Sequence, residues 1–369
     1  MQTLGDRATR STNSFDFIRW LAASLVIVSH EYAVTGSPGA EPMLALSRGF
    51  TTMGAIGLDI FFVVSGFLVT RSLLERRSLR FFVAARAMRI LPALAVVLAL
   101  SAFVLGPLLS DLAPGEYLAN AHTWSYITRN LGLRHQQLEL PGVFSRNAIP
   151  NAVNGSLWSL WPEVQMYGWV LLLGAIAALR WRLGAAIVVG GMTIALAVAW
   201  RHHGDLTGTA LEPGTLARLA PYFALGSVAW CLRRRLPFTA AIPTAVGVLA
   251  VATFHTPAFV PAFALALASA VLWFAYASLG PLARWGRYGD FSYGLYIFAS
   301  PVQQALATLF PEWGILRHGG VAYALTLVCA IASWKLVEAP VLVLKRRLGA
   351  RSPVRGPTDA ACVPPQPRG

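Results

Sequence analysis

Long apolar stretches alternate with short polar segments along almost the whole chain. Ten of these stretches have the length, about 17–25 residues, that a helix needs to cross a bilayer. They cover approximately residues 17–34, 54–74, 82–106, 157–179, 183–200, 214–232, 238–254, 258–279, 289–309 and 319–343. The pattern predicts an all-α protein, a polytopic membrane helix bundle with about ten transmembrane helices.

The composition of the chain is typical of a membrane protein. Of its 369 residues, 56% are hydrophobic and only 12% are charged, whereas a soluble domain carries about 25% charged residues. On a soluble chain, the net charge of +14 would indicate nucleic-acid binding. Because the arginines cluster in short loops between apolar stretches, we expect a lipid bilayer as the partner and no nucleic acid.

The distribution of positive charge predicts how the bundle is oriented. With the N-terminus inside, most of the Lys and Arg residues fall in segments on the cytoplasmic side. We therefore expect a multi-pass protein whose N- and C-termini are both cytoplasmic. Residues 1–350 would form the integral-membrane domain, and the Pro- and Arg-rich segment 351–369 a disordered cytoplasmic tail. The three cysteines show no metal-binding spacing, so no metal is expected.

Arg19 and His30 are ionisable residues inside the first apolar stretch. Eleven residues of helix make three turns plus about 20° and rise about 16 Å, so both side chains lie on one face. That arrangement suits a long ligand with an anionic head and a reactive far end. Alternatively, Arg19 extends to the membrane interface and His30 is a structural histidine, although an ionisable residue inside a membrane usually marks a functional site.

Two carboxylates accompany His30. Asp59 starts the second stretch and Glu163 lies early in the fourth, at depths that we predict to match that of His30. A carboxylate beside a histidine fixes its tautomer and raises its basicity, so His30, Asp59 and Glu163 are the candidate catalytic residues. The alternatives are a helix cap for Asp59 and a stabilising contact with the helix dipole for Glu163.

Further residues are candidates for ligand binding. Arg86 and Arg89 share one helix face and, with Arg19, would bind phosphates of a cytoplasmic cofactor; the alternative is a pair of positive-inside anchors. Trp158 and Trp161 are expected to offer a stacking surface to a sugar, or else belong to an interfacial aromatic belt. Ser65 joins them as a substrate-binding candidate. Ser65 and the following Gly66 do not form a G-x-S-x-G motif, so a hydrolase nucleophile is not expected there. The alternative is that these small residues allow close helix packing.

Several of these positions lie in recognisable motifs. The segments are 15–19 with His30, 57–68, 81–92, 154–163, 292–296 and 337–340. They resemble the motifs of acyltransferase family 3, membrane proteins that O-acylate bacterial surface glycans and some secreted metabolites. The chain departs from that pattern at Val164, where many members have a second carboxylate. It departs again at Ala299 and Ser300, where many have a histidine before the proline.

The resemblance implies an enzyme of the bacterial inner membrane. Its donor would be acetyl-CoA or another acyl-CoA used from the cytoplasm, and its acceptor a hydroxyl on a glycan or lipid-linked glycan. His30 would act as general base or accept the acyl group transiently, with Asp59 or Glu163 orienting it. The alternative is a transporter or flippase that moves an amphiphilic glycan without acyl chemistry.

Overall fold

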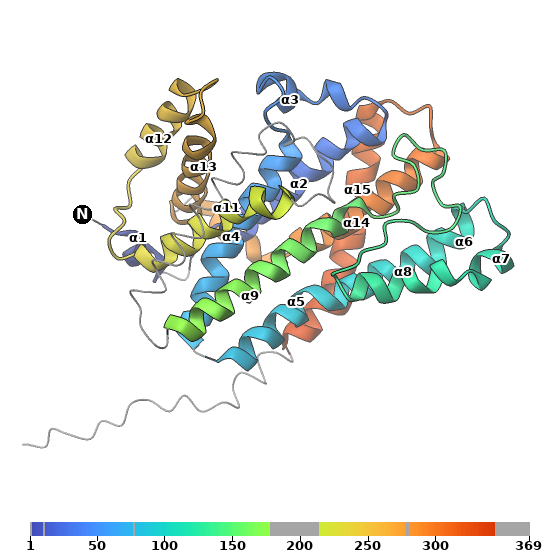
Figure 1. Cartoon of the computed structure of the whole chain (residues 1–369), viewed down its shortest axis with the longest axis horizontal. Helices are drawn as coiled ribbons and strands as arrows, with labels where there is room; N and C mark the ends of the chain where they lie inside the picture. The colour runs from blue at the N-terminus through green and yellow to red at the C-terminus, as the bar shows by residue number, and fades with distance from the viewer. Residues whose placement is uncertain (1, 10–11, 77, 178–213, 278–279, 344–369) are drawn as a thin grey trace, which may run out of the picture.

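Every regular element in the described part of the chain is a helix (Figure 1). The structure is a computed structural model that describes residues 2–9, 12–76, 78–177, 214–277 and 280–343. Within these ranges, extended backbone pairs only at two isolated bridges, Thr3 with Pro237 and Ser110 with Val143. The prediction of an all-α protein is thus confirmed.

Eight longer helices make up most of the bundle. They are α2 (Phe15–Val34), α4 (Met53–Arg76), α5 (Leu79–Leu100), α9 (Leu160–Ala177), α11 (Gly214–Leu232), α13 (Phe259–Tyr276), α14 (Ser292–Leu309) and α15 (Ile315–Ser333). Shorter helices connect or extend them: α1 (Leu4–Ala8), η1 (Pro38–Ala40), α3 (Pro42–Leu46), η2 (Ser101–Leu105), α6 (Gly106–Leu109), α7 (Pro114–Ala119), α8 (Ala121–Leu131), η3 (Gly155–Ser159), α12 (Ala241–Ala252), η4 (Gly280–Tyr288) and η5 (Trp334–Glu338).

Five of the described helical segments are long and apolar enough to cross a membrane. They are Phe15–Val34, Met53–Glu75, Leu79–Leu109, Phe259–Tyr276 and Ile315–Val343. The predicted count of about ten is not confirmed, although a helix lies within each expected span that the structure describes. The expected span 183–200 and the expected tail 351–369 lie outside the described residues. Helix α12, with 12 residues, is shorter than the stretch 238–254 predicted for it.

Helix α4 runs through the centre of the bundle, between α2 and α11 (Figure 1). It is antiparallel to α2: Gly57 abuts the backbone of Ala22, and the Phe67 ring lies 5.7 Å from that of Phe15. These contacts show which positions of α2 and α4 lie at the same height in the bundle. They also define two ends of the bundle. We call them the Arg19 end, where α2 begins, and the His30 end, where α2 finishes.

Glycines allow α4 and α11 to approach closely. A Cβ atom at Gly66 would overlap the carbonyl oxygen of Phe223, and one at Gly226 would overlap that of Val63. Small residues of this kind let the backbones of membrane helices pack against each other. The contact fixes the position of α4, the helix that carries Ser65 and Asp59.

Helices α14 and α15 pack beside α2. The side-chain amide of Gln303 on α14 donates a hydrogen bond to the Ile27 carbonyl at 2.9 Å. On α15, Nδ1 of His318 lies 2.6 Å from a carboxylate oxygen of Glu31. Both contacts lie near the His30 end.

The segment between α5 and α9 folds over the His30 end of the bundle (Figure 1). Tyr117 and Tyr126 from its helices are fully buried, and the Tyr117 hydroxyl donates to the Ala102 carbonyl at 2.9 Å. The Asn147 and Asn154 side-chain amides donate to α14 carbonyls, each at 2.9 Å. This segment is therefore an ordered part of the bundle.

Candidate functional site

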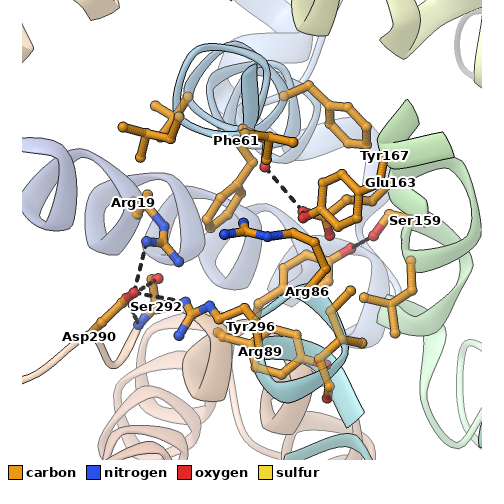
Figure 2. Close-up of a pocket in the computed structure, with 18 of the residues that line it drawn as sticks. Arg19, Phe61, Arg86, Arg89, Ser159, Glu163, Tyr167, Asp290, Ser292 and Tyr296 are labelled. Atoms are coloured by element: carbon orange, nitrogen blue, oxygen red, sulfur yellow. Dashed lines mark hydrogen bonds and ion pairs between the residues drawn. The ribbon is translucent and has the colours of Figure 1, made fainter. Parts of the chain in front are cut away.

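A cavity of about 290 Å³ lies among α2, α4, α5, α9 and the start of α14 (Figure 2). Its size is near the lower end of the range of small-molecule sites. Among its lining residues are five that the sequence singled out: Arg19, Ser65, Arg86, Arg89 and Glu163. These residues come from four helices that are distant in sequence, so the fold brings most of the candidate polar residues to one place.

Arg19 and Arg89 share a carboxylate partner. A side-chain oxygen of Asp290 lies 2.8 Å from a guanidinium nitrogen of each arginine. Arg89 also pairs with Glu338 at 3.4 Å, and Glu338 accepts a hydrogen bond from the Ser333 hydroxyl at 3.1 Å. The positive charge of Arg19 and Arg89 is therefore largely balanced from within the protein.

Arg86 has a different environment. Its guanidinium lies 5.7 Å from the centre of the Tyr167 ring and 6.0 Å from that of Phe82. In the described ranges, no carboxylate forms an ion pair with it, and its buried Nε has no hydrogen-bond partner. Figure 2 shows its side chain reaching into the cavity. A guanidinium that faces a cavity without a carboxylate partner is well suited to bind an anion.

Glu163 accepts hydrogen bonds from two hydroxyls. The Ser65 hydroxyl on α4 donates to it at 3.1 Å, and the Tyr167 hydroxyl, one turn further along α9, donates to the same oxygen. The Glu163 carboxylate therefore links α4 to α9 inside the cavity. It also fixes the orientation of the Ser65 hydroxyl, which donates its hydrogen to Glu163.

Two aromatic rings are part of the cavity wall on the side toward the His30 end. The centres of the Phe61 and Tyr296 rings are 6.0 Å apart, in an edge-to-face arrangement. The hydroxyls of Tyr296 and Ser159 share a hydrogen bond of 2.7 Å. Both rings lie close to the level of Leu58, which also lines the cavity.

His30 lies beyond this wall. Gly57 abuts Ala22, and His30 is eight residues further along α2, about 12 Å at the rise of an α-helix. His30 is half-buried and does not line the cavity. Position 30 shares the Arg19 face of α2, as the sequence predicts from helix geometry, but the cavity reaches only the Arg19 end of that face.

The predicted layer of His30, Asp59 and Glu163 does not form. Asp59 pairs with Arg218 of α11 at 3.0 Å, and both side chains are mostly buried. Among the described residues, no hydrogen bond joins His30 to either carboxylate. Glu163 instead faces the cavity, about two helical turns closer to the Arg19 end than the predicted layer required.

The two tryptophans also lie away from the cavity. Trp158 is in η3 and Trp161 is at the start of α9, and both are half-buried. Trp158 packs against the main hydrophobic core. In the part of the chain that the structure describes, no three His, Cys, Asp or Glu side chains gather to hold a metal ion.

Comparison with known proteins decides the family. The model for the acyltransferase domain of acyltransferase family 3 matches residues 12–335, nearly the whole chain. The chain belongs to acyltransferase family 3. It is thus a multi-pass membrane protein of an acyltransferase family, as the motifs predicted.

Individual relatives of this family 3 chain agree with that assignment. An O-acetyl transferase of Shigella phage Sf6 is 29% identical over 335 residues, which cover 89% of this chain and 95% of the relative. Nodulation protein 10 of Rhizobium leguminosarum bv. viciae is 28% identical, with 92% and 95% covered. A relative from Komagataeibacter xylinus, named as a proposed membrane-bound transacylase, is 27% identical, with 94% and 88% covered. No solved structure is significantly similar to the chain.

Sequence reasoning missed three features of the cavity and its surroundings in this family 3 chain. Asp290, the shared partner of Arg19 and Arg89, lies in a short linker before α14 where no pattern points to it. Tyr167 follows Glu163 by four residues. This spacing places both side chains on one helix face, so it could have identified Tyr167 from the sequence. Glu31, whose buried carboxylate binds His318 and Gln303, stands beside His30 in the sequence and was overlooked.

Proposed function

We propose that this chain transfers an acyl group, typically acetyl, from an acyl-CoA to a hydroxyl of a glycan. Family membership supports acyl transfer, and a relative named as an O-acetyl transferase supports a hydroxyl acceptor. The observation that carries the donor assignment is Arg86. Its guanidinium faces a cavity inside the bundle and has no carboxylate partner among the described residues, in contrast to Arg19 and Arg89.

The donor enters the cavity from the Arg19 end. Arg86 binds its phosphates, because a guanidinium matches phosphate geometry, and Arg19 and Arg89 supply further donors at the same end. The thioester then points toward the His30 end. Since Arg19 and His30 are separated by about 16 Å along α2, an extended arm between phosphate and thioester bridges the two levels.

The acceptor approaches from the opposite end. His30 takes the proton of the acceptor hydroxyl, and the hydroxyl oxygen attacks the carbonyl carbon of the thioester. The carbon–sulfur bond breaks as the new carbon–oxygen bond forms, and the leaving thiolate takes up the proton that His30 accepted, so the products are the O-acylated acceptor, free CoA and neutral His30. Separate approaches for donor and acceptor keep the nucleotide-bearing donor on the cytoplasmic side and the glycan on the other.

The test compares wild type with His30→Ala in nanodiscs that also contain a native-membrane lipid extract. Radiolabelled acetyl-CoA is added, and free CoA and labelled lipid are measured. Because general acid–base catalysis contributes about 10²–10⁴-fold, we expect His30→Ala to release CoA at least about 100-fold more slowly. His122→Ala, an exposed histidine in α8, is the matched control and should behave like wild type.

Each contrary result has a distinct meaning. Activity of His30→Ala within a few-fold of wild type would remove His30 from the mechanism. If wild type neither binds acyl-CoA nor releases CoA, the donor assignment is wrong, and transport of an amphiphilic glycan becomes the better explanation of the charges inside the bundle.

A further inference from the structure

Two aromatic side chains line the cavity on its side toward His30. Phe61 projects from α4 and Tyr296 from α14, and their rings meet edge to face with centres 6.0 Å apart (Figure 2). We call this pair the Phe61–Tyr296 constriction. On α14 no residue beyond Tyr296 lines the cavity, and on α4 only Leu58 lies beyond Phe61 toward the His30 end.

One side of the constriction is fixed and the other is not. The Tyr296 hydroxyl shares a hydrogen bond of 2.7 Å with Ser159, and both residues are buried, with exposures of 6% and 5%. Phe61 carries no polar atom, is only partly buried, and packs against the small apolar cluster that contains Ala23 and Ile27. Rotation of Phe61 breaks no hydrogen bond, whereas displacement of Tyr296 breaks one.

Two independent contacts place the constriction short of His30. Along α4, Leu58 lies beside the level of Ala22, so His30 is about 12 Å further on. Along α14, Tyr296 precedes Gln303 by seven residues, about 10 Å, and Gln303 is hydrogen-bonded to Ile27 and Glu31, which flank the level of His30. An acyl group that moves along the cavity from Arg86 toward His30 therefore meets this pair of rings.

We infer that the Phe61–Tyr296 constriction selects the donor by the length of its acyl chain. The inference rests on the proposed function and adds the residues that limit the length of the acyl group. An acetyl group adds little bulk to the end of the donor arm. Each further methylene must fit between two aromatic rings, one of which is held in place by Ser159. Phe61 and Tyr296 are thus specificity-determining residues for the acyl group.

The experiment measures kcat/KM for acetyl-CoA and butyryl-CoA by release of free CoA. One methylene changes selectivity by about 10–200-fold in a close-fitting apolar site, so wild type should prefer acetyl-CoA by at least about tenfold. Phe61→Ala should reduce that ratio by about tenfold or more. Leu68→Ala is the matched control, because it removes a similar apolar side chain from the same helix and cavity but away from the constriction. It should leave the ratio unchanged.

Two further variants keep the test decisive. Phe61→Leu retains an apolar side chain if Phe61→Ala fails to fold, and it should lower the ratio in the same direction. Ser159→Ala releases the Tyr296 hydroxyl and should lower the ratio less than Phe61→Ala does.

The inference is overturned if wild type uses the two donors equally, or if Phe61→Ala and Leu68→Ala change the ratio alike. These outcomes leave the proposed function standing, since CoA is still released. If wild type releases CoA from neither donor, the proposed function itself fails.

Discussion

Single residues that look equivalent in the sequence differ in their partners. Arg19, Arg86 and Arg89 all precede or begin apolar stretches, and sequence reasoning assigned them one role. In the folded protein, Asp290 lies between Arg19 and Arg89 and Glu338 binds Arg89, while Arg86 stacks on Tyr167. Arg19 and Arg89 therefore hold the Arg19 end together, whereas Arg86 is the candidate ligand-binding residue of the three.

Replacing Arg89 should therefore destabilise the protein, and replacing Arg86 should not. Arg89→Ala leaves the largely buried carboxylate of Glu338 without its ion-pair partner and deprives Asp290 of one of two arginines. Removal of one partner from a buried pair costs about 3–5 kcal/mol. Thermal unfolding in detergent should show this loss for Arg89→Ala. Arg86→Ala should melt like wild type but bind acyl-CoA at least tenfold more weakly, roughly the effect of one charged hydrogen bond.

Equal melting losses for the two variants would contradict this division of roles. So would unchanged acyl-CoA binding by Arg86→Ala, because the donor assignment depends on that side chain.

At the scale of helices, α4 packs against two neighbours, α2 and α11, at the same time. One of its faces packs on α2, with Gly57 against Ala22, and another packs on α11 through Gly66 and Gly226. The Thr70 hydroxyl also donates to the Ser227 hydroxyl at 3.0 Å across the α4–α11 contact. Because Ser65 and Phe61 project from this helix, its position determines the shape of the cavity.

An alanine at Gly226 should force α4 and α11 apart. Its Cβ would overlap the Val63 carbonyl oxygen and lie 2.8 Å from the Phe67 nitrogen. Overpacking of this kind costs about 1–3 kcal/mol, so we expect a lower melting temperature and less folded protein in size-exclusion chromatography. Gly168→Ala in α9 is the control, because a Cβ there meets no atom within 4 Å. A Gly226→Ala protein as stable as Gly168→Ala would refute the close-packing argument.

At the scale of the whole molecule, the two ends of the bundle differ in chemistry. The Arg19 end carries the ion pairs of Asp290 with two arginines. The His30 end is covered by the segment that contains α6, α7 and α8 (Figure 1). The positive-inside pattern predicts that the Arg19 end faces the cytoplasm, which is also where an acyl-CoA donor is found.

Cysteine labelling tests this orientation. In a background with the native cysteines replaced by serine, Gly115→Cys on α7 should react with a membrane-impermeant maleimide in intact cells. Arg80→Cys, exposed in the first turn of α5, should react only after the cells are permeabilised. The reverse pattern would place the cavity on the wrong side for a cytoplasmic donor.

The sequence predicted the helical class well because hydropathy alone determines it. Stretches of apolar residues must be helical to satisfy their backbone hydrogen bonds in lipid, and the helices of the described residues follow them. The number of spans was harder to predict. The stretch 238–254 contains a helix, Ala241–Ala252, that ends where Thr253 caps its backbone and a turn follows.

The site was predicted in part. Arg19, Arg86, Arg89, Ser65 and Glu163 line one cavity, and the sequence singled them out because polar and ionisable side chains inside apolar stretches often mark functional positions. The predicted layer failed because depth was counted from the helix ends. A position along one helix does not reveal which neighbour it meets. Asp59 meets Arg218 of α11, which is 159 positions away in the chain, and no local pattern encodes that pairing.

The ion pair between Arg89 and Glu338 joins residues that are 249 positions apart. During synthesis, α5 therefore reaches the bilayer long before the ribosome has made either carboxylate that neutralises its arginine. The arginine gains its first counter-charge only when Asp290 has been made, and its second when Glu338 follows. A chain that stops before Glu338 leaves the ion-pair network of the Arg19 end incomplete, and we expect it to be less stable in the membrane than the full chain.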